Sequence, residues 1–309
     1  MDLRDLCDEI DGLMTLDVGF RGVARGLYPA ARLHANKPLS LAAAEMLMNA
    51  SRVLLVTGFK VLPRIVQETD GPPGALILAK TLVDLGVEVS IAIEEDSTRI
   101  LKAGLEVLDI DCEVLPLPIN VDLTDYSREL LNKKPVSSLV FIEKAGSNEV
   151  GVYHNMRGSD VTQYHAKAEA LLHEAKRRGL NVMAVGDGGN EVGFGLIKKA
   201  VELYVPKGRR CGCPCGGGIA SSSKADLVIV ASTSNIGCYA ISCALSMLNG
   251  APWPHSREVE VELIKALIDA GAVDGMTCRS EMMVDGVPIN ITASIVELLR
   301  HISDEARKH

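Results

Sequence analysis

The stretch 181-NVMAVGDGGNEVGFG-195 decides how this chain is interpreted, because an apolar run passes there directly into acidic residues and glycines. Residues 182–185 predict a buried strand. The glycines that follow permit backbone conformations closed to residues with a Cβ, so Asp187 can be presented at a tight corner before a helix. Such a corner suits a metal, an ammonium group or a phosphate. Taken alone, it fits equally well a turn whose Asp merely caps the helix.

The same succession of apolar run, polar loop and helical pattern recurs along the chain. The predicted strands are residues 52–56, 87–93, 112–115, 138–142, 181–185 and 226–231. The predicted helices are residues 73–85, 98–108, 124–131, 162–178, 191–203 and 235–248. Six such alternations predict an α/β fold, a doubly wound and mostly parallel sheet of about six strands with helices on both faces.

The two ends of the chain depart from this rhythm. Residues 2–14 and 40–50 predict helices, the second with Ser40 as N-cap, and the segment between them is broken by glycines. Residues 1–50 are therefore expected to form a helical N-terminal extension packed on a single Rossmann-like domain, residues 51–309. The domain closes with a small C-terminal cap: helices at 258–270 and 291–302, and a hairpin at 282–289 with Asp285-Gly286 at its turn.

Composition narrows the class of function. Of 309 residues, 47% are hydrophobic, only 4% are aromatic, and the net charge is −8 without a long basic run. This favours a small-molecule substrate and argues against nucleic acid or a membrane as partner. No apolar stretch reaches the roughly 18 residues of a membrane span, and the acidic start does not resemble a signal peptide. We expect a cytoplasmic protein with reduced cysteines, and leave open whether it forms a homo-oligomer.

Ligands of open parallel sheets bind beyond the carboxyl ends of the strands, so the loops there are the candidates for a site. The loop at 57–75 is long and ends in Asp70, Gly71, two prolines and Gly74 at a helix start, where an anion can dock. The alternative is a rigid turn before a helix. After residue 231, Ser234 and Asn235 belong to a polar run that exceeds what capping needs, which leaves hydrogen bonds for a ligand.

The loop at 142–162 holds the densest set of functional side chains. Glu143 and Lys144 leave the strand, and Asn155, Arg157 and Asp160 follow. An arginine offers a planar fork for a carboxylate and a lysine offers a point charge or a proton, so this loop suits a carboxylate or phosphate substrate. A structural network of salt bridges is the alternative.

Three cysteines in the run 211-CGCPC-215 raise the question of a metal site. The spacing is not C-x-x-C, and no fourth ligand stands at a zinc-like interval in the sequence. A metal cluster, redox-sensitive thiols and a plain irregular loop all remain open, the last being favoured.

Several short motifs resemble one known family in their order along the chain, the D-glutamate cyclase C-terminal domain family. They are VTGF (56–59), ETDGPPGA (68–75), IEKAG (142–146), HNMRGSD (154–160), GDGGNEVGFG (186–195) and SNIGCYA (234–240), with the pair Arg21-Gly22 and the segment AAAEMLMNA (42–50). The resemblance implies a carbon–oxygen lyase that cyclises D-glutamate to 5-oxo-D-proline with loss of water. Animal members are mitochondrial and carry a further hydro-lyase-like N-terminal part, Ile236 stands where relatives commonly have Trp, and the CGCPC run is outside the pattern.

Ring closure needs a base, an acid and support for an oxyanion. From the resemblance and the loop positions, we expect Asp187 or Glu143 to accept the ammonium proton and Lys144 to stabilise the oxyanion. The expected substrate contacts are Arg157 on the α-carboxylate, the amides of Gly188 and Gly189 on the oxyanion, and Asn155, Asn190 and Asn235 for orientation. A divalent metal, Mn²⁺ or Mg²⁺ on Asp160, Asp187 or Glu191, is the alternative to the lysine.

Three other functions share features with this sequence. A haloacid-dehalogenase-like phosphatase shares a similar acidic glycine turn but needs an aspartate nucleophile after the first strand, where this chain reads LLVTGFK (54–60). A dinucleotide-dependent dehydrogenase needs GxGxxG at the same place, which is lacking. A metabolite-binding module without catalysis remains the main alternative.

Overall fold

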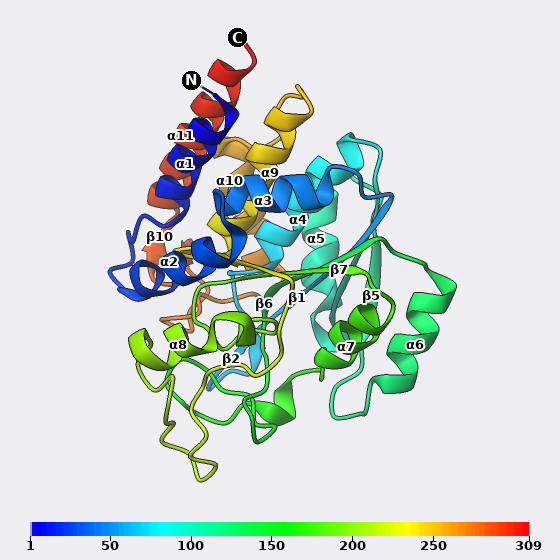
Figure 1. Cartoon of the computed structure of the whole chain (residues 1–309), viewed down its shortest axis with the longest axis vertical. Helices are drawn as coiled ribbons and strands as arrows, with labels where there is room; N and C mark the ends of the chain where they lie inside the picture. The colour runs from blue at the N-terminus through cyan, green and yellow to red at the C-terminus, as the bar shows by residue number, and fades with distance from the viewer. Residues whose placement is uncertain (1, 309) are drawn as a thin grey trace.

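A six-stranded parallel sheet forms the centre of the molecule in the computed structural model, which describes residues 2–308 (Figure 1). Its strands lie in the order β5-β4-β1-β6-β7-β8. Their bounds are β1 Arg52–Gly58, β4 Glu88–Glu94, β5 Glu113–Leu117, β6 Ser138–Lys144, β7 Asn181–Gly186 and β8 Leu227–Val230. All neighbouring strands in this sheet pair in parallel, which confirms the predicted doubly wound α/β class.

Helices cover both faces of the sheet, as crossovers between parallel strands require (Figure 1). On one side, α4 (Pro72–Asp84) packs on β1 and β4 and against α9 (Ser234–Leu248), with α5 (Thr98–Leu108) beside it. On the other side, α6 (Thr124–Lys133) and α7 (Glu169–Arg177) pack together. Helix α9 is buried along most of its length because the terminal helices cover its outer side.

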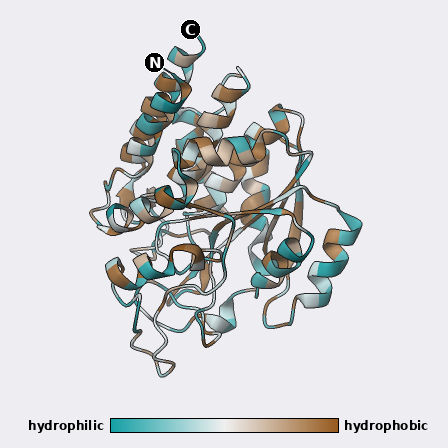
Figure 2. Cartoon of the chain, viewed as in Figure 1, coloured by the Kyte–Doolittle hydropathy of each residue, from teal (hydrophilic) through white to brown (hydrophobic). Residues whose placement is uncertain are grey.

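The two ends of the chain meet in that outer layer. Helices α1 (Leu3–Met14), α3 (Leu39–Leu47) and α11 (Ile289–Ala306) all contact α9, and α10 (Arg257–Asp269) joins α11 to α5. Figure 2 shows α1 and α11 coloured both brown and teal, as expected of helices with one face on a core. The helical start of the chain is thus confirmed, whereas the division into parts at residue 50 stays a prediction.

Several predicted boundaries were wrong for local reasons. The segment broken by glycines contains a helix, α2 (Val23–Ala35). Gly26 stands within it because the close approach of α2 to α8 (Lys198–Tyr204) leaves no room for a side chain there. Ser40 is not an N-cap: Pro38 precedes the helix, and the Ser40 hydroxyl donates to the carbonyl of Cys7.

Two predicted helices begin later than expected. The region 191–203 starts with a turn and a short 3-10 helix before α8, because Glu191 folds back on the preceding loop. Residues 162–178 contain a 3-10 turn, Thr162–Tyr164, and then α7. The predicted long loop 57–75 holds a small hairpin of β2 (Lys60–Val61) and β3 (Val66–Gln67). The predicted C-terminal hairpin is confirmed as β9 (Met283–Val284) and β10 (Val287–Pro288).

The strand order places a topological switch point between β1 and β6. Chain segments leave these two adjacent strands toward opposite halves of the sheet, and ligands of such folds bind in the crevice that opens there. Among residues 2–308, no helix is both long and apolar enough to span a membrane.

Candidate functional site

A cavity of about 490 Å³ opens at the carboxyl ends of the strands, beside the switch point. Four carboxylic acids and two arginines line it. We call Glu68, Glu143, Asp187 and Asp285 the cavity acids. The remaining lining side chains are mostly apolar and include Val61, Leu62 and Pro63 of the β2–β3 hairpin. A cavity of this size accommodates a small charged metabolite.

Arg21 holds two of the cavity acids together. Its guanidinium donates to both oxygens of Asp187, at 2.5 Å from Nη1 and 3.1 Å from Nη2, and Nη1 also donates to Asp285. The three residues come from the turn before α2, the end of β7 and the C-terminal hairpin. Burial alone would lower the pKa of Arg21, but Asp187 and Asp285 outweigh it and raise the pKa well above its usual value. Arg21 is therefore a permanent cation in the cavity wall.

The cavity acids outnumber the cations that face them, and the pKa values of all four acids are raised. Burial raises the pKa of Glu68 and of Glu143 well above the usual value, and the neighbouring carboxylates raise both further. Burial also raises the pKa of Asp187, against the pull of Arg21, and raises that of Asp285 to about 7. The site can therefore hold protons near neutral pH, which is what acid–base chemistry requires.

Glu143 reaches the cavity through a β-bulge. The pairing of β6 with β1 shifts register at this point, and Glu143 adopts a positive φ of 41°. Its carboxylate accepts a 2.6 Å hydrogen bond from the Ser234 hydroxyl. Gly71, with φ of 93°, lies directly against it, since a Cβ there would come within 2.7 Å of the Glu143 Cβ. The predicted residues Glu143, Gly71 and Ser234 thus lie together.

Asp70 and Asn235 cap each other's helices and so fix the floor of the site. Asp70 accepts from the backbone N–H groups of Ser234 and Asn235 at 2.8 and 2.9 Å, at the start of α9. The Asn235 side chain accepts from the N–H groups of Gly71 and Gly74, both at 2.9 Å, at the start of α4. The amides expected to dock an anion already have partners, so these residues act as positioning groups.

The glycine-rich turn is organised by Glu191 in a similar way. Its carboxylate accepts from the N–H groups of Asp187, Gly188 and Gly189, at 2.9, 2.7 and 2.6 Å. The expectation that the Gly188 and Gly189 amides support an oxyanion is therefore not met by this arrangement, because Glu191 occupies them. Burial raises the pKa of Glu191, and the three N–H groups oppose that rise.

The loop after β6 supplies the opposite wall. Asn155, Arg157 and Asn190 line the cavity, as expected from the sequence. The Asn190 amide donates to the carbonyl of His154 at 2.8 Å, which ties the loop to the turn after β7. Arg157 is exposed, and its Nη2 donates to the carbonyl of Met276 at 3.1 Å.

Lys144 does not take part in this group. Its side chain is fully buried and forms an ion pair with Glu94, at the end of β4. His165 lies beside them, with Nδ1 at 3.6 Å from Glu94. Glu94 lies on β4, whereas the partners of Glu143 lie at the starts of α4 and α9, so the two adjacent side chains have different surroundings. The expected role of Lys144 on the oxyanion has no support in this placement.

The predicted metal ligands are also only partly brought together. Asp160 is exposed, and its carboxylate accepts from the N–H of Thr162. Carboxylate oxygens that could share a cation come from two other sets, each within 4.8 Å: Asp70, Asp187 and Asp285, or Glu143, Asp187 and Glu191. Oxygen ligands of this kind suit Mg²⁺ or Mn²⁺.

Three residues of the site were missed by reasoning from the sequence. Arg21 and Asp285 do not follow a strand of the central sheet, and Glu68 lies in the middle of a loop. A signal existed for each: Arg21-Gly22 and ETDGPPGA are motifs of the resembled family, and Asp285-Gly286 was recognised as a turn, although only for its backbone.

With this geometry in place, comparison with known proteins is informative. The family model "D-glutamate cyclase-like, C-terminal" matches residues 10–300. The chain belongs to this family. The match covers both Arg21 and Asp285, so the whole cavity falls inside the family's own region.

A human relative is similar to much of this chain. The human protein named D-glutamate cyclase, mitochondrial, is 30% identical over 253 residues, which is 78% of this chain and 38% of the human protein. Similarity to solved structures is weak. An actinorhodin polyketide ketoreductase with NADPH (14% identity, TM-score 0.31) aligns over 84% of this chain and 93% of its own. A tRNA N6-threonylcarbamoyladenosine dehydratase of E. coli with AMP (12% identity, TM-score 0.30) aligns over 73% and 94%. Neither supports a conclusion.

Proposed function

We propose that this chain is a carbon–oxygen lyase that cyclises D-glutamate to 5-oxo-D-proline with loss of water. The observation that carries the proposal is the surplus of buried acids over arginines in the cavity of a D-glutamate cyclase-like family member. Such a surplus suits a substrate that brings its own cation. The name of the human relative supports the choice of substrate, although the matched region is only part of that protein.

D-Glutamate offers one ammonium group and two carboxylates, and the cavity offers partners for each. The ammonium group would lie among the cavity acids. Arg157 stands at the wall with free donors and would bind the α-carboxylate through its planar fork. The side-chain carboxylate would then point toward Arg21, the buried cation between Asp187 and Asp285.

Ring closure moves two protons from the amine nitrogen to the departing oxygen. Asp187, held by Arg21 through two hydrogen bonds, accepts a proton from the ammonium group, and the nitrogen lone pair attacks the side-chain carboxyl carbon. The new C–N bond leaves an oxyanion near Arg21, which takes the role first expected of Lys144. Asp187 returns its proton to the second oxygen of the former carboxylate, which becomes a hydroxyl. Glu143, whose pKa is raised by burial and by the neighbouring carboxylates, donates a proton to this hydroxyl, which leaves as water when the C–O bond breaks, and Glu143 then takes the second proton of the nitrogen.

A divalent cation is a separate part of the proposal. Mg²⁺ or Mn²⁺ held by Asp187 with Asp70 and Asp285 would polarise the same carboxyl oxygen. Arg21 already pairs with two of these acids, so a cation would have to displace its guanidinium. Activity that persists after chelation would favour Arg21, and activity restored only by the metal would favour the cation.

The test is direct assay of the purified chain. We expect 5-oxo-D-proline from D-glutamate and less from L-glutamate, measured by chiral chromatography after chelation and again with Mg²⁺ or Mn²⁺ added. Absence of product in every arm, together with a raised melting temperature, would instead indicate a binding module without catalysis.

A matched pair of arginine variants locates the substrate. Arg157→Ala should raise KM for D-glutamate about 10-fold or more without loss of stability, because Arg157 is exposed and makes one hydrogen bond. Arg128→Ala removes an equally exposed arginine on α6 and serves as the control. Equal KM values for the two variants would remove Arg157 from the proposed site.

A further inference from the structure

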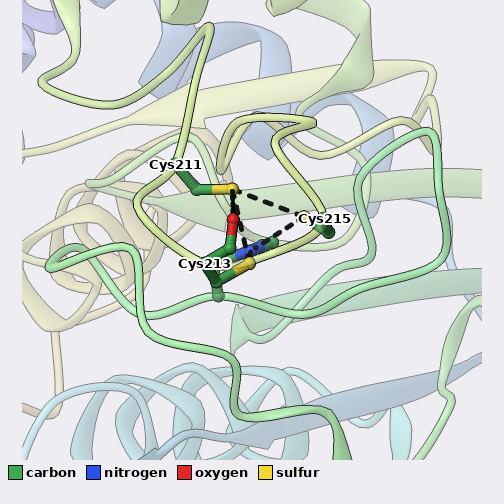
Figure 3. A group of neighbouring side chains, drawn as sticks. Cys211, Cys213 and Cys215 are labelled. Atoms are coloured by element: carbon green, nitrogen blue, oxygen red, sulfur yellow. Dashed lines mark hydrogen bonds between the residues drawn. The ribbon is translucent and has the colours of Figure 1, made fainter.

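The CGCPC run meets a fourth ligand that is remote in sequence. The Sγ atoms of Cys211, Cys213 and Cys215 converge, as Figure 3 shows, and the Nε2 atom of His154 joins them. All four ligand atoms lie within 4.8 Å of one another. His154 is fully buried, 57 positions before Cys211, in the loop that forms a wall of the cavity. We propose that these four residues bind one zinc ion in a closed, tetrahedral site.

The distances fit one ion at the centre of the group. Cys211 Sγ lies 3.4 Å from Cys213 Sγ and 3.3 Å from Cys215 Sγ. His154 Nε2 lies 3.2 Å from Cys213 Sγ and 3.5 Å from Cys215 Sγ. Tetrahedral zinc, with bonds of about 2.3 Å to sulfur and about 2.0–2.1 Å to nitrogen, sets ligands about 3.6–3.8 Å apart. These four pairs of atoms need to separate by no more than a few tenths of an ångström, and the other two pairs lie within 4.8 Å.

The surroundings resemble the outer shell of a metal site. Cys215 Sγ receives the backbone N–H of Gly217 at 3.4 Å and the Asn148 side-chain amide at 3.5 Å. Such donors stabilise a thiolate and orient it. Asn148 is buried and also donates to the carbonyl of Gly218 at 2.8 Å, which fixes the loop after the last cysteine.

The ligand set selects the metal and the role. Three thiolates and one imidazole are soft and borderline ligands, which favour Zn²⁺ over Mg²⁺ or Ca²⁺. Four protein ligands leave no open position, and closed sites of this kind are structural rather than catalytic. An iron–sulfur cluster would need its sulfur ligands further apart, because they would bind different iron atoms.

The zinc would fasten the CGCPC loop to the cavity wall. His154 directly precedes Asn155, and its carbonyl accepts a hydrogen bond from the Asn190 side chain. Asn155 and Asn190 both line the cavity. Lys207, just before the cysteines, donates to the carbonyl of Arg157 and forms a second link between the same two segments. The site would thus hold the loop that carries Arg157 in place, whatever ligand the cavity takes.

Metal content tests the proposal independently of any activity. The full chain, purified without chelators from cells supplied with zinc, should contain about one zinc ion per chain, as measured by inductively coupled plasma mass spectrometry. Replacement by Co²⁺ should give the charge-transfer and intense d–d absorption of a tetrahedral thiolate site. Folded wild-type chain without zinc, with stoichiometric iron, or with a disulfide between two of the three cysteines would overturn it.

Variants assign the ligands. Cys213→Ser and His154→Ala should lose most of the zinc, whereas Cys278→Ser, which alters a half-buried cysteine outside the cluster, should keep it. Asn148→Ala should weaken zinc binding about 10-fold in competition with a chromophoric chelator, because it removes an outer-shell donor. Full zinc content in Cys213→Ser would contradict the assignment. If that variant does not fold, the cobalt spectrum of the wild-type chain decides.

Discussion

Two adjacent residues at the end of β6 belong to two different groups of buried charged side chains, and the two groups differ in the balance of positive and negative charge. Glu143 belongs to the cavity acids, which outnumber the arginines around them. Lys144 and Glu94, which we call the sealed pair, are both fully buried and match one cation with one anion. Burial alone would raise the pKa of Glu94, but Lys144 and His165 together outweigh it and lower that pKa to about 2.

The difference in charge balance distinguishes a group that can bind a ligand from a group that only stabilises the fold. A balanced buried pair satisfies its own charges and leaves nothing for a ligand. A buried group with more acids than cations can bind protons or a cationic ligand. The pKa values of its acids are therefore raised. Burial and charge are common to both groups, so only the balance marks the cavity as the site.

The largest expected effect comes from breaking the sealed pair. Lys144→Ala leaves Glu94 buried without its partner and should cost about 3–5 kcal/mol of unfolding free energy, measured by urea denaturation. The double variant Glu94→Leu/Lys144→Met removes both charges and should recover much of that loss. A Lys144→Ala protein of unchanged stability that has lost turnover would place Lys144 in the chemistry after all.

The matching change in the cavity should show the opposite profile. Glu143→Gln keeps the shape of the side chain and removes a buried carboxyl whose pKa is raised by burial and by the neighbouring carboxylates, so stability should change by less than about 1 kcal/mol. Turnover of D-glutamate should fall about 100-fold or more, because the amide cannot donate the proton to the leaving hydroxyl. Steady-state kinetics and urea denaturation on one preparation measure both; parental turnover would remove Glu143 as the acid.

The two groups should also respond to pH in opposite directions. The folded pKa of Asp285 is raised from 3.8 to about 7, so its contribution to stability is complete below about 3.8 and is lost as pH rises toward 7. The folded pKa of Glu94 is lowered from 4.5 to about 2, so its contribution is present above about 4.5 and is lost as pH falls.

Asp285→Asn tests this sign. Between pH of about 4 and about 7, the variant should lose stability less steeply than the parent, by on the order of 1 kcal/mol per pH unit. Thermal and urea unfolding at several pH values measure the slopes, and Asp269→Asn on the exposed face of α10 is the control. Parallel slopes for all three proteins would show that Asp285 titrates normally.

The smallest effect is expected where charge is not buried. Lys134 and Glu113 pair on the surface, away from the cavity and the sealed pair. Lys134→Ala should change the unfolding free energy by less than about 1 kcal/mol, and less still at high salt. A loss as large as that of Lys144→Ala would mean that burial does not explain the comparison.

The sequence predicted the sheet and the position of the site because both depend on local patterns. Apolar runs located the strands, and the rule for parallel sheets brought Asp187 and Glu143 together at one end. Arg21 pairs with Asp187 across 166 positions and with Asp285 across 264, and no local pattern specifies such a contact. The contact of His154 with the three cysteines could not be predicted for the same reason.

Other errors had a local cause that spacing alone conceals. The amides of Gly188 and Gly189 look free in the sequence, yet Glu191 folds back onto both. Lys144 stands beside Glu143 in the chain, but it pairs with Glu94 on β4 and not with the partners of Glu143. Residue type predicted the chemistry available, whereas side-chain direction decided which residues share it.

Asp187→Asn tests the central claim most directly. Asp187 is the cavity acid that Arg21 holds with two hydrogen bonds, at the turn around which the fold is built. The variant should stay folded, by circular dichroism and thermal unfolding, while the wild-type chain should form 5-oxo-D-proline from D-glutamate at least about 100-fold faster. A folded Asp187→Asn protein that turns over D-glutamate at the parental rate would contradict it.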